Sequence, residues 1–399
     1  MMAALFAARE GVQVTLLERN EKLGKKIYIT GKGRCNVTNQ CSREEFLSQV
    51  PHNPRFLYSA LSLLPPESLM ELLESAGCPL VVERGNRVFP KSYKASDVTR
   101  TLAGEMQRAG ISVKLNARVQ RLLVSDGRVS GLVLTSGEMV MADAVIVATG
   151  GKSYSVTGST GDGYRLAEEA GHTVTPLKPS LVPLACSEPW PGQLTGLSLK
   201  NVRLTVKCRG KTVYNELGEM LFTHFGISGP LVLEASSHMV DFPSDVWQMT
   251  LDLKPGLTME QLDARLLRDF EAMSRKQFLS VMPGLLPGKL AEIFPQLAGI
   301  PHDKPVNQIS RQERLKIGAL LKELPLPVSG ARPLEEAIVT RGGVTVTEVA
   351  PATMESKLLP GLYFAGELLD VDAHTGGFNL HIAFSTGALA GRSAARNLL

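Results

Sequence analysis

The segment Val-Gln-Val-Thr-Leu-Leu-Glu at residues 12–18 decides the fold class. It is largely apolar, as expected of a strand buried on both faces of a sheet, and it ends on the acidic residue Glu18. The Ala-rich stretch at residues 1–10 has the composition of a helix end and closes at Gly11. A helix, a strand and a terminal acid in this order are typical of a dinucleotide-binding α/β domain, where the acid binds a ribose hydroxyl group. Taken alone, Glu18 could equally be a charged residue that ends an ordinary strand.

Such a domain normally opens with a strand and a Gly-x-Gly-x-x-Gly loop, and neither is present before the helix end at residues 1–10. The first strand would lie in the middle of the sheet, and without it two strand edges would lie unpaired in the core. We therefore expect the natural start to lie upstream by roughly 10–20 residues, which is enough for one strand and one turn.

Composition sets the broad class of the protein. A chain of 399 residues is long enough for two or three domains. Hydrophobic residues make up 44% and charged residues 21%, which is typical of a globular protein and argues against disorder. The net charge of +4 comes from 43 basic and 39 acidic residues scattered along the chain, which argues against a nucleic-acid partner. The oligomeric state stays open.

The cysteines and the apolar segments indicate where the protein works. The five cysteines are odd in number, widely spaced and free of any Cys-x-x-Cys pair, which predicts free thiols and no metal site. No basic leader and no run of about 18 apolar residues occurs, so we expect a cytoplasmic protein without a membrane span. Prolines cluster after about His172, and the buried-strand pattern returns near residue 336. These shifts predict an inserted domain at 173–335.

A glycine- and lysine-rich loop follows the first strand and contains Gly-Lys-Gly-Arg-Cys-Asn-Val-Thr-Asn at residues 31–39. Glycine lets the backbone approach a ligand closely, and Lys25 and Arg34 can offset phosphate charge. The loop therefore suits a pyrophosphate, although charge alone is also typical of a solvated basic loop. Cys35 is a reactive thiol or, as we favour, a packed free cysteine.

Two later strands run into glycine. Asp-Ala-Val-Ile-Val-Ala-Thr-Gly-Gly at residues 143–151 includes Thr149 and Gly150. Gly-Leu-Tyr-Phe-Ala-Gly-Glu at residues 361–367 ends on Gly366 and Glu367. Such strand ends are typical of places where a chain passes close to a cofactor, and acids there can bind ribityl hydroxyl groups. An ordinary strand followed by a turn is the alternative in each case.

The glycine pair Gly376 and Gly377 opens an Ala-rich helix expected over residues 382–397. Two glycines next to Phe378 and Asn379 are hard to explain without a close ligand. A helix N-terminus at this place can stabilise negative charge on a reduced flavin ring. An ordinary strand, turn and helix remain the alternative.

Three motifs together resemble a known family. They are residues 31–39, Phe-Thr-His-Phe-Gly-Ile-Ser-Gly-Pro at residues 222–230, and Thr-Gly-Gly-Phe-Asn-Leu at residues 375–380. In this order they are similar to bacterial NAD(P)/FAD-dependent oxidoreductases, the aminoacetone-oxidase-like flavoproteins that include the bile-acid Δ4,6-reductase type. The resemblance covers nearly the whole chain.

The resemblance implies a fold and a set of cofactor residues. The fold is an FAD-binding, Rossmann-like three-layer α/β domain, built from residues 1–172 and 336–399, with an inserted β-barrel-like plus helical substrate domain at 173–335. Glu18 would bind the adenosine ribose and Val119 the adenine through its backbone. The pyrophosphate, ribityl chain and flavin would be lined by the remaining matches: Lys25, Arg34, Cys35, Asn36, Thr149, Gly150, Gly366, Glu367, Asp372, Gly376, Gly377, Phe378, Asn379 and Leu380.

FAD carries the hydride in such enzymes, so the protein need not supply a nucleophile. No second Gly-x-Gly-x-x-Gly motif is present, and we expect NADH or NADPH to bind transiently as electron donor. The resemblance favours reduction of an enone or dienone, with a 3-oxo-4,6-dienoic bile acid as the most specific candidate. An oxidase of small amines or aminoketones and an RNA-associated flavoprotein are the alternatives.

Two sets of side chains in the sequence are candidates for contact with the substrate. The weak candidates for a proton donor are His224, His374, His381 and Tyr363, and each could instead be structural. Phe222, Phe225, Ile227 and Leu231 could line a pocket for a small, flat hydrophobic substrate, or could only pack the inserted domain.

Overall fold

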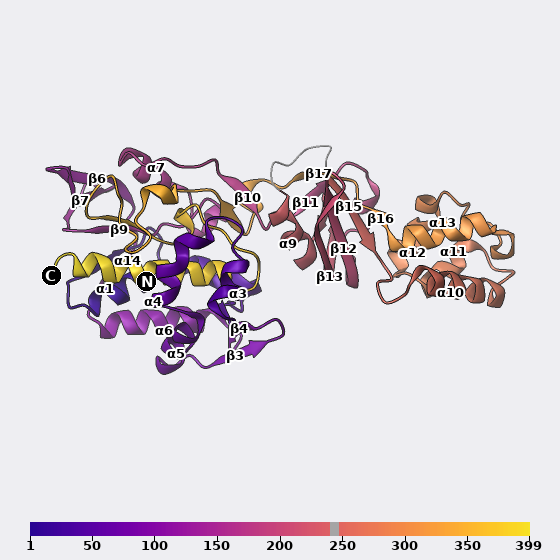
Figure 1. The fold of residues 1–399 in the computed structure, drawn as a ribbon, viewed down its shortest axis with the longest axis horizontal. Coiled ribbons are helices and arrows are strands. Elements are labelled where there is room, and N and C mark those ends of the chain that lie inside the picture. Colours follow the sequence, from indigo (N-terminus) through magenta and orange to yellow (C-terminus); the bar gives the residue numbers. More distant parts are fainter. Residues whose placement is uncertain (240–246) are drawn as a thin grey trace. The chain divides into compact units, whose positions relative to one another are not determined.

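The computed structural model describes residues 1–239 and 247–399, which fall into two compact units (Figure 1). The first unit comprises Met1–Ser180 and Leu334–Leu399, and the second comprises Leu181–Pro333. The first unit is therefore discontinuous in sequence.

The first unit is built on parallel strand pairs with helices packed beside them. Strand β1 (Thr15–Leu17) pairs in parallel with β5 (Ser112–Lys114), and β9 (Val145–Val147) pairs in parallel with β19 (Leu362–Phe364). The strand expected at residues 12–18 is confirmed, although it is shorter. The mixed α/β, Rossmann-type class predicted from the sequence is confirmed as well.

Helices at the two ends of the chain pack against each other in this unit. Helix α1 (Met2–Ala8) lies beside α14 (Phe378–Arg396), which is drawn in yellow in Figure 1. A side chain at Gly391 of α14 would collide with the backbone of Ala3, so the absence of one lets the two helices approach closely. The other helices of the unit are α2 (Lys25–Ile29), α3 (Arg43–Ser48), α4 (Tyr58–Leu63), α5 (Pro66–Ser75), α6 (Ala95–Arg108) and α7 (Asp162–Glu169).

Antiparallel strands complete the first unit. One sheet has the order β2-β4-β3, from β2 (Thr38–Asn39), β3 (Leu80–Glu83) and β4 (Arg87–Pro90). A second has the order β6-β7-β8, from β6 (Val119–Ser125), β7 (Arg128–Leu134) and β8 (Met139–Met141). Strands β10 (Lys178–Ser180) and β18 (Val339–Arg341) form a pair that joins the two sequence segments of this unit.

The second unit contains an antiparallel sheet of seven strands in the order β16-β15-β12-β13-β14-β11-β17. The two long central strands, β12 and β13, alternate buried and less buried positions, as a half-buried sheet requires. The order ends at β16 and β17, so the barrel-like part takes the form of an open sheet among the described residues. Its strands are β11 (Leu184–Cys186), β12 (Ser198–Cys208), β13 (Lys211–Thr223), β14 (Gly226–Ser228), β15 (Trp247–Asp252), β16 (Leu324–Pro325) and β17 (Val328–Ala331).

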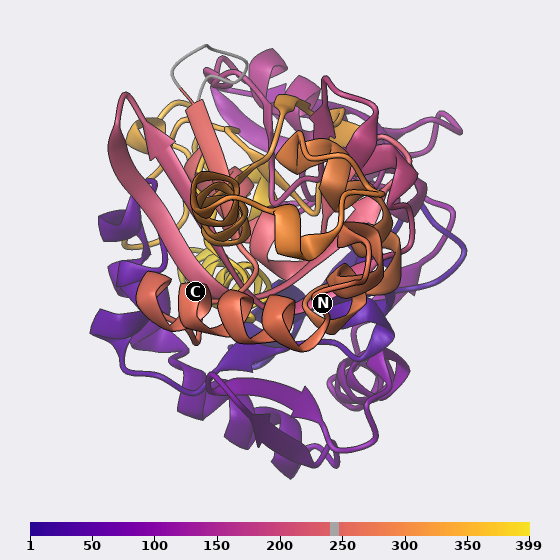
Figure 2. The same ribbon diagram turned by 90° about the vertical axis from the view of Figure 1, so that its right-hand side faces the viewer.

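Helices α10 to α13 gather at one end of the second unit, at the right in Figure 1 and toward the viewer in Figure 2, whereas α9 lies beside the sheet. Capping boxes begin two of them, with Thr258 before α10 and Ser310 before α13. These helices and one face of the sheet enclose a single apolar core that includes Phe222 and Phe294. The helices of the unit are α8 (Trp190–Gln193), α9 (Pro230–His238), α10 (Met259–Ala272), α11 (Phe278–Val281), α12 (Gly288–Ala298) and α13 (Arg311–Lys322).

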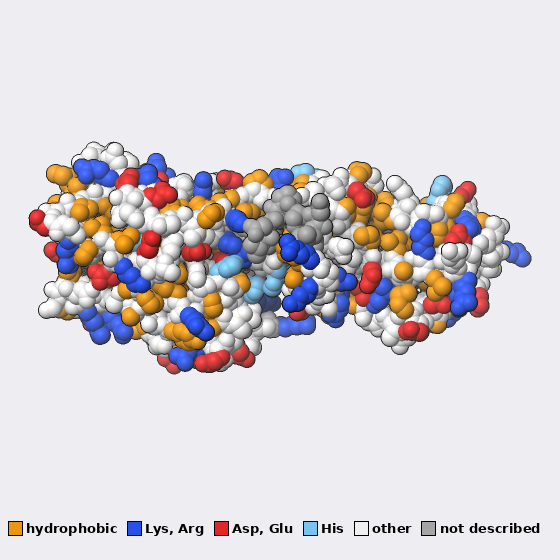
Figure 3. All heavy atoms as spheres, turned by 45° about the horizontal axis from the view of Figure 1, so that its top comes forward, with side chains coloured by type: hydrophobic (Ala, Val, Ile, Leu, Met, Phe, Trp, Pro, Cys, Tyr) orange, Lys and Arg blue, Asp and Glu red, His pale blue; other side chains and the backbone are white. Residues whose placement is uncertain are grey.

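The distribution of surface charge and the apolar character of the helices can be compared with what the composition predicts. On the molecular face drawn in Figure 3, basic and acidic side chains are interspersed, in agreement with the scattered charge of the sequence. Among the described residues, no helix combines the length and the apolar character needed to cross a bilayer.

Candidate functional site

The end of β1 brings together the two residues predicted to bind adenosine. Glu18 directly follows β1, and its Oε1 accepts hydrogen bonds from the backbone N and the side-chain Nδ2 of Asn20, each at 2.8 Å. The backbone N of Ala117 donates to the carbonyl O of Glu18 at 2.8 Å, which places Val119, at the start of β6, beside the same strand end. Both residues are half-buried and thus accessible in part.

The ends of β9 and β19 hold a charged cluster centred on Glu367. Its Oε2 lies 2.7 Å from Lys26 Nζ, and its Oε1 accepts from the backbone N of Thr340 at 2.8 Å and from Ser153 Oγ at 3.0 Å. Lys26 also donates to Ser153 Oγ at 2.8 Å. A Cβ on Gly151 would stand 2.9 Å from Glu367 Oε1, so only glycine fits next to this carboxylate.

The neighbouring predicted residues lie at the same strand ends. Thr149 and Gly150 follow β9, and the Thr149 side chain contacts Gly163 of α7 closely enough to exclude a side chain there. Gly366 follows β19, and its backbone N donates to Thr386 Oγ1 of α14 at 3.0 Å. Because β9 and β19 are parallel neighbours, these ends meet at one edge, where ligands of open α/β sheets bind.

The loop at residues 31–39 turns two predicted side chains away from Glu367. Lys25 pairs with Glu21 at 2.8 Å, whereas Lys26 makes the contact with Glu367. Arg34 lies over the Phe89 ring, 4.3 Å from its centroid. The positions predicted for Lys25 and Arg34 beside the cofactor remain predictions, and in this structure both side chains are engaged elsewhere.

Cys35 is buried in the same loop and has a positive φ of 59°. Burial raises the pKa of its thiol to about 12, so the thiolate form is not populated near neutral pH. The structure therefore agrees with a packed free cysteine rather than a reactive thiol.

The turn before α14 explains its glycine pair through contacts within the protein. Gly377 has a φ of 101°, and a Cβ there would stand 2.5 Å from the carbonyl carbon of Thr38. A Cβ on Gly376 would stand 2.7 Å from the ring of Phe378. The chain itself therefore excludes side chains at both positions, which gives the glycine pair a structural cause, and a ligand close to it stays a prediction.

The first residues of α14 also have structural partners. The Phe378 ring packs edge-on against Phe46, with 5.0 Å between centroids. Asn379 Oδ1 accepts from the backbone N of Ala373, and its Nδ2 donates to the Ala373 carbonyl O. Leu380 packs against the apolar cluster near α1 and α6. These contacts fix the backbone at the start of the helix, where the N–H groups of the first turn have no intrahelical partner.

Asp372 lies in the loop before this turn and is 1% exposed. Its Oδ2 accepts from Ser180 Oγ at 3.0 Å and from Arg341 Nε and Nη2 at 3.3 Å. Its Oδ1 is buried and has no hydrogen-bond partner among the described residues. The same is true of Asn36 Oδ1, which lies 2.8 Å from the Cβ position of Gly377.

These two oxygens test whether the site fits an FAD. A buried acceptor without a donor is costly, and a ligand donor normally satisfies it. Both Asn36 and Asp372 belong to segments next to the glycine turn at the start of α14. Hydroxyl and ring N–H groups are the donors that a flavin and its ribityl chain present, so the residues here fit the cofactor.

Two of the four candidate proton donors have their polar atoms engaged. His381 is fully buried: Nε2 donates to the carbonyl O of Leu64 and Nδ1 accepts from Thr38 Oγ1, both at 2.9 Å. Burial lowers the pKa of His381 to about 4. The hydroxyl of Tyr363 accepts from Asn397 Nδ2 at 2.8 Å, and burial raises its pKa to about 12.

The other two histidines differ in their settings. His224 is exposed in the second unit and its ring packs edge-on against Phe225. His374 is half-buried in the first unit, and its backbone N donates to the Gln49 carbonyl O. Both stay predictions as proton donors.

The apolar candidates of the second unit divide in a similar way. Phe222, Ile227 and Leu231 are buried in its core, so they pack the unit. Phe225 lies near Arg332, whose guanidinium carbon is 4.5 Å from its ring centroid.

Sequence analysis missed the residues that organise the Glu367 cluster. Lys26, Ser153 and Thr340 contact Glu367 across sequence separations of up to 341 residues, and only the fold brings them together. For Lys26, the adjacent Lys25 and the lysine-rich loop were the available signal.

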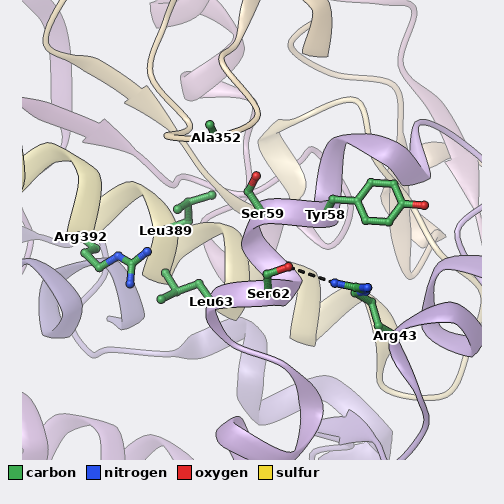
Figure 4. A pocket seen from close by; sticks show the side chains of 8 residues that line it. All are labelled: Arg43, Tyr58, Ser59, Ser62, Leu63, Ala352, Leu389 and Arg392. Carbon is green, nitrogen blue, oxygen red and sulfur yellow. Dashed lines mark hydrogen bonds between the residues drawn. The ribbon is translucent and has the colours of Figure 1, made fainter.

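A separate hollow of about 630 Å³ lies in the first unit (Figure 4). Arg43 and Arg392 stand at two sides of it, and Arg43 donates to Ser62 Oγ at 3.2 Å. None of the predicted cofactor residues lines this hollow. It is lined by Arg43, Tyr58, Ser59, Ser62, Leu63, Ala352, Leu389 and Arg392.

Comparison with known proteins identifies the family. The family described as "HI0933-like protein Rossmann domain" matches residues 1–393. The chain belongs to the HI0933-like family. A 3-dehydro-bile acid Δ(4,6)-reductase of Clostridium scindens is 31% identical over 99% of this HI0933-like chain and 96% of its own. A ribosomal RNA dihydrouridine synthase of Haemophilus influenzae is 32% identical over 99% and 96%.

Among solved structures, a 3-ketosteroid Δ1-dehydrogenase from Sterolibacterium denitrificans is similar in fold. It is 14% identical, with a TM-score of 0.50 over 99% of this chain and 97% of its own. The family predicted from the three motifs is confirmed, and with it the enzyme class: HI0933-like proteins are FAD-dependent oxidoreductases.

Proposed function

We propose that this chain is an FAD-dependent reductase of a C=C bond conjugated to a carbonyl group. The reaction adds a hydride and a proton across the C=C bond and oxidises one NADH or NADPH for each bond reduced. The observation that carries the proposal is the pair of buried, unpartnered acceptor oxygens, Asn36 Oδ1 and Asp372 Oδ1, beside the glycine turn before α14. They are the acceptors that a bound flavin would satisfy.

Bound FAD would supply the hydride, and the side chains of the chain would hold and orient the cofactor. Asp372 Oδ1 and Asn36 Oδ1 would accept hydrogen bonds from cofactor donors, and Arg341 holds Asp372 in place through hydrogen bonds to its Oδ2. Glu18 would accept from the ribose hydroxyls at the end of β1. The unpaired backbone N–H groups at the start of α14 can stabilise negative charge that develops near them.

The first candidate substrate is a dienone, and most specifically a 3-oxo-4,6-dienoic bile acid. The full-length relative named as a bile-acid Δ(4,6)-reductase supports it. In such a substrate the carbonyl withdraws electrons from the C=C bonds, which makes the distant carbon an acceptor for hydride. This candidate needs a small apolar binding site and no charged docking surface.

The second candidate is a uridine in ribosomal RNA, and it is supported by the relative named as a dihydrouridine synthase. The C5=C6 bond of uracil is conjugated to its C4 carbonyl, so its reduction to dihydrouridine is the same addition of hydride and proton. One family fold could therefore serve both substrates by a single chemistry. The basic stretch at residues 84–94 of the first unit, which contains no acidic residue, favours this candidate.

The test follows flavin colour through one catalytic cycle. The purified chain is reconstituted with FAD, reduced without oxygen by NADH or NADPH, and then mixed with one oxidant at a time. The oxidants are a 3-oxo-4,6-dienoic bile acid, unmodified ribosomal RNA transcribed in vitro, and air. Products are identified by mass spectrometry as a gain of two hydrogen atoms.

We expect the yellow colour to bleach with a nicotinamide and to return with the dienone or the RNA. Recovery with air alone, or bleaching by small amines in place of nicotinamides, would support an oxidase instead. A chain that retains no flavin under any condition would overturn the proposal.

A further inference from the structure

Two segments of the first unit bring positive charge to one face. Residues 84–94 contain four basic residues and no acidic residue. This stretch covers the β3–β4 turn, β4 and the approach to α6, and it lies against the loop at residues 31–39, because β4 pairs with β2 at Thr38↔Val88. We call the following set the basic face: Lys22, Lys32, Arg34, Arg84, Arg87, Lys91 and Lys94 with the aromatic residues Tyr28, Phe89 and Tyr93.

Only part of this charge is neutralised. Glu83 pairs with Arg34 at 3.0 Å and lies 3.8 Å from Arg87. Lys32, Arg84 and Lys91 are exposed and form no ion pair with the residues that the structure describes. Exposed cations that form no ion pair are available to contact phosphates and to release counterions when a polyanion binds.

Aromatic rings lie between these cations. The Arg34 guanidinium carbon is 4.3 Å from the centroid of Phe89 and 5.4 Å from that of Tyr93. Tyr93 is 41% exposed and has a φ of 55°, so the chain holds a ring at the surface in an uncommon backbone conformation. Lys22 Nζ lies 4.7 Å from the Tyr28 centroid. Phe89 is 2% exposed and Tyr28 is half-buried, so Tyr93 is the exposed ring of this set. An exposed ring among basic side chains is typical of surfaces on which unpaired bases stack.

The basic face continues into the candidate flavin site. Arg34 is two residues from Asn36, whose unpartnered Oδ1 lies next to Gly377 at the start of α14. The backbone of Val37 also donates to the Val88 carbonyl O at 2.9 Å, which ties the loop to β4. A polyanion held on this face would therefore lie at the border of the site where reduction takes place.

We propose that the basic face binds RNA, with its cations on the phosphates and Tyr93 beneath an unpaired base. This inference rests on the second candidate function above and adds to it the surface that would hold the RNA. A bile acid carries a single carboxylate and would use few of these cations. The small net charge argues against a nucleic-acid partner. Net charge is summed over the whole chain, however, so it does not show whether basic residues gather on one face.

The experiment measures binding of in vitro-transcribed ribosomal RNA to the FAD-loaded protein over a series of salt concentrations. The test variant is the double substitution Arg84→Ala/Lys91→Ala. The matched control is Arg55→Ala/Arg121→Ala, which removes two exposed arginines elsewhere on the first unit. Reduction of the bound flavin by NADH or NADPH is recorded for every protein.

We expect the test variant to bind RNA about tenfold more weakly than the original protein. The slope of log binding constant against log salt concentration should become less steep by about 1 to 2, as expected from the loss of one or two phosphate contacts. The control should match the original protein in both, and flavin reduction should be unchanged in all three. Equal RNA binding by test and control variants would overturn the proposed surface while leaving the reductase untouched. If neither NADH nor NADPH reduces the flavin bound to the original protein, the result would instead count against the proposed function.

A second pair of variants tests the aromatic contact. Tyr93→Ala should weaken RNA binding about tenfold through the lost stacking. Tyr58→Ala is its control, because Tyr58 is also exposed and also lies near an arginine, with Arg43 5.8 Å from its centroid. If the original protein binds polyglutamate as tightly as RNA, the face is a general polyanion site and the proposal for RNA fails.

Discussion

The two units differ in what they bury. Among the described residues, every buried polar or charged side chain lies in the first unit except Ser236 and Ser237. Both units have apolar cores, two clusters in the first and one large cluster in the second, but the second has few buried polar groups beside its core. Buried polar groups need partners, so an interior rich in them can position a polar ligand, whereas an apolar interior mainly stabilises. The buried polar groups of the first unit support the proposal that this unit binds the cofactor, and they give it a feature that the second unit has only at Ser236 and Ser237.

The chain offers a separate probe for each unit. Both tryptophans, Trp190 and Trp247, lie in the second unit. A flavin bound at the candidate site would report on the first. Tryptophan fluorescence and flavin absorbance can therefore follow the two regions independently in one sample.

The largest effect should come from the apolar core of the second unit. Phe294 of α12 is 0% exposed, and Phe294→Ala should lower the free energy of unfolding by about 3–5 kcal/mol through lost burial and a cavity. Denaturant titration followed by tryptophan fluorescence measures it. Leu267→Ala, at a position 39% exposed on α10, should cost less than about 1 kcal/mol. A marked loss of FAD affinity in Phe294→Ala would break the division between the units.

The next effect should come from the glycine turn of the first unit. Gly377→Ala combines a φ of 101° with a Cβ 2.5 Å from the carbonyl carbon of Thr38, and it should destabilise the first unit by about 3 kcal/mol. Thermal unfolding followed by circular dichroism measures the loss. Gly137→Ala is the control, because its φ is 88° but no atom lies within 4 Å of its Cβ. Equal losses in both variants would show that strain alone, without the contact to Thr38, makes glycine necessary.

Local sequence patterns predicted several of the helices and strands. Residues 65–77 and 94–110 have the hydrophobic periodicity of helices and form α5 and α6, and the strands expected before each glycine segment are β9 and β19. Such elements follow from hydrophobic periodicity and turn residues, which are properties of short windows. Side-chain partners do not follow from such windows. Lys26 rather than Lys25 contacts Glu367, because the direction of each lysine depends on where α2 packs.

The glycine pair before α14 shows a different limit of sequence interpretation. A conformational need for glycine can be inferred from sequence, but its cause is a neighbour that only the fold supplies. For Gly377 the neighbour is the backbone of Thr38, which is more than 300 residues away in sequence, whereas for Gly376 it is the nearby ring of Phe378. His381 is a similar case, since its partners Thr38 and Leu64 come from distant segments.

Acid should destabilise the first unit through His381. Its pKa is about 4 in the folded protein and about 6.5 when unfolded, so between these values the unfolded chain binds the extra proton. The contribution of His381 to the free energy of unfolding is therefore fully present above pH 6.5, and it falls by up to about 3 kcal/mol as the pH approaches 4. Unfolding followed by circular dichroism from pH 7.5 to 4 measures the slope. The stability of His381→Gln should depend less on pH over this range than that of the original protein. The stability of His302→Gln, which alters an exposed position, should depend on pH as that of the original protein does.

The smallest effect separates ligand binding from stability within the polar interior. Asn36 Oδ1 is buried without a partner among the described residues, so Asn36→Ala should leave the unfolding free energy of the FAD-free protein unchanged or slightly higher. If a cofactor donor satisfies that oxygen, the variant should bind FAD about tenfold more weakly, which corresponds to a net hydrogen bond of about 1.4 kcal/mol. Fluorescence titration with FAD measures the affinity.

Asn379→Ala should show the opposite pattern in stability. The Asn379 amide holds Ala373 through two hydrogen bonds, and their loss should destabilise the FAD-free protein by about 1 kcal/mol. Unchanged FAD affinity in Asn36→Ala would mean that the unpartnered oxygen only destabilises the fold locally, and Asp372 alone would then support cofactor binding in the polar interior of the first unit.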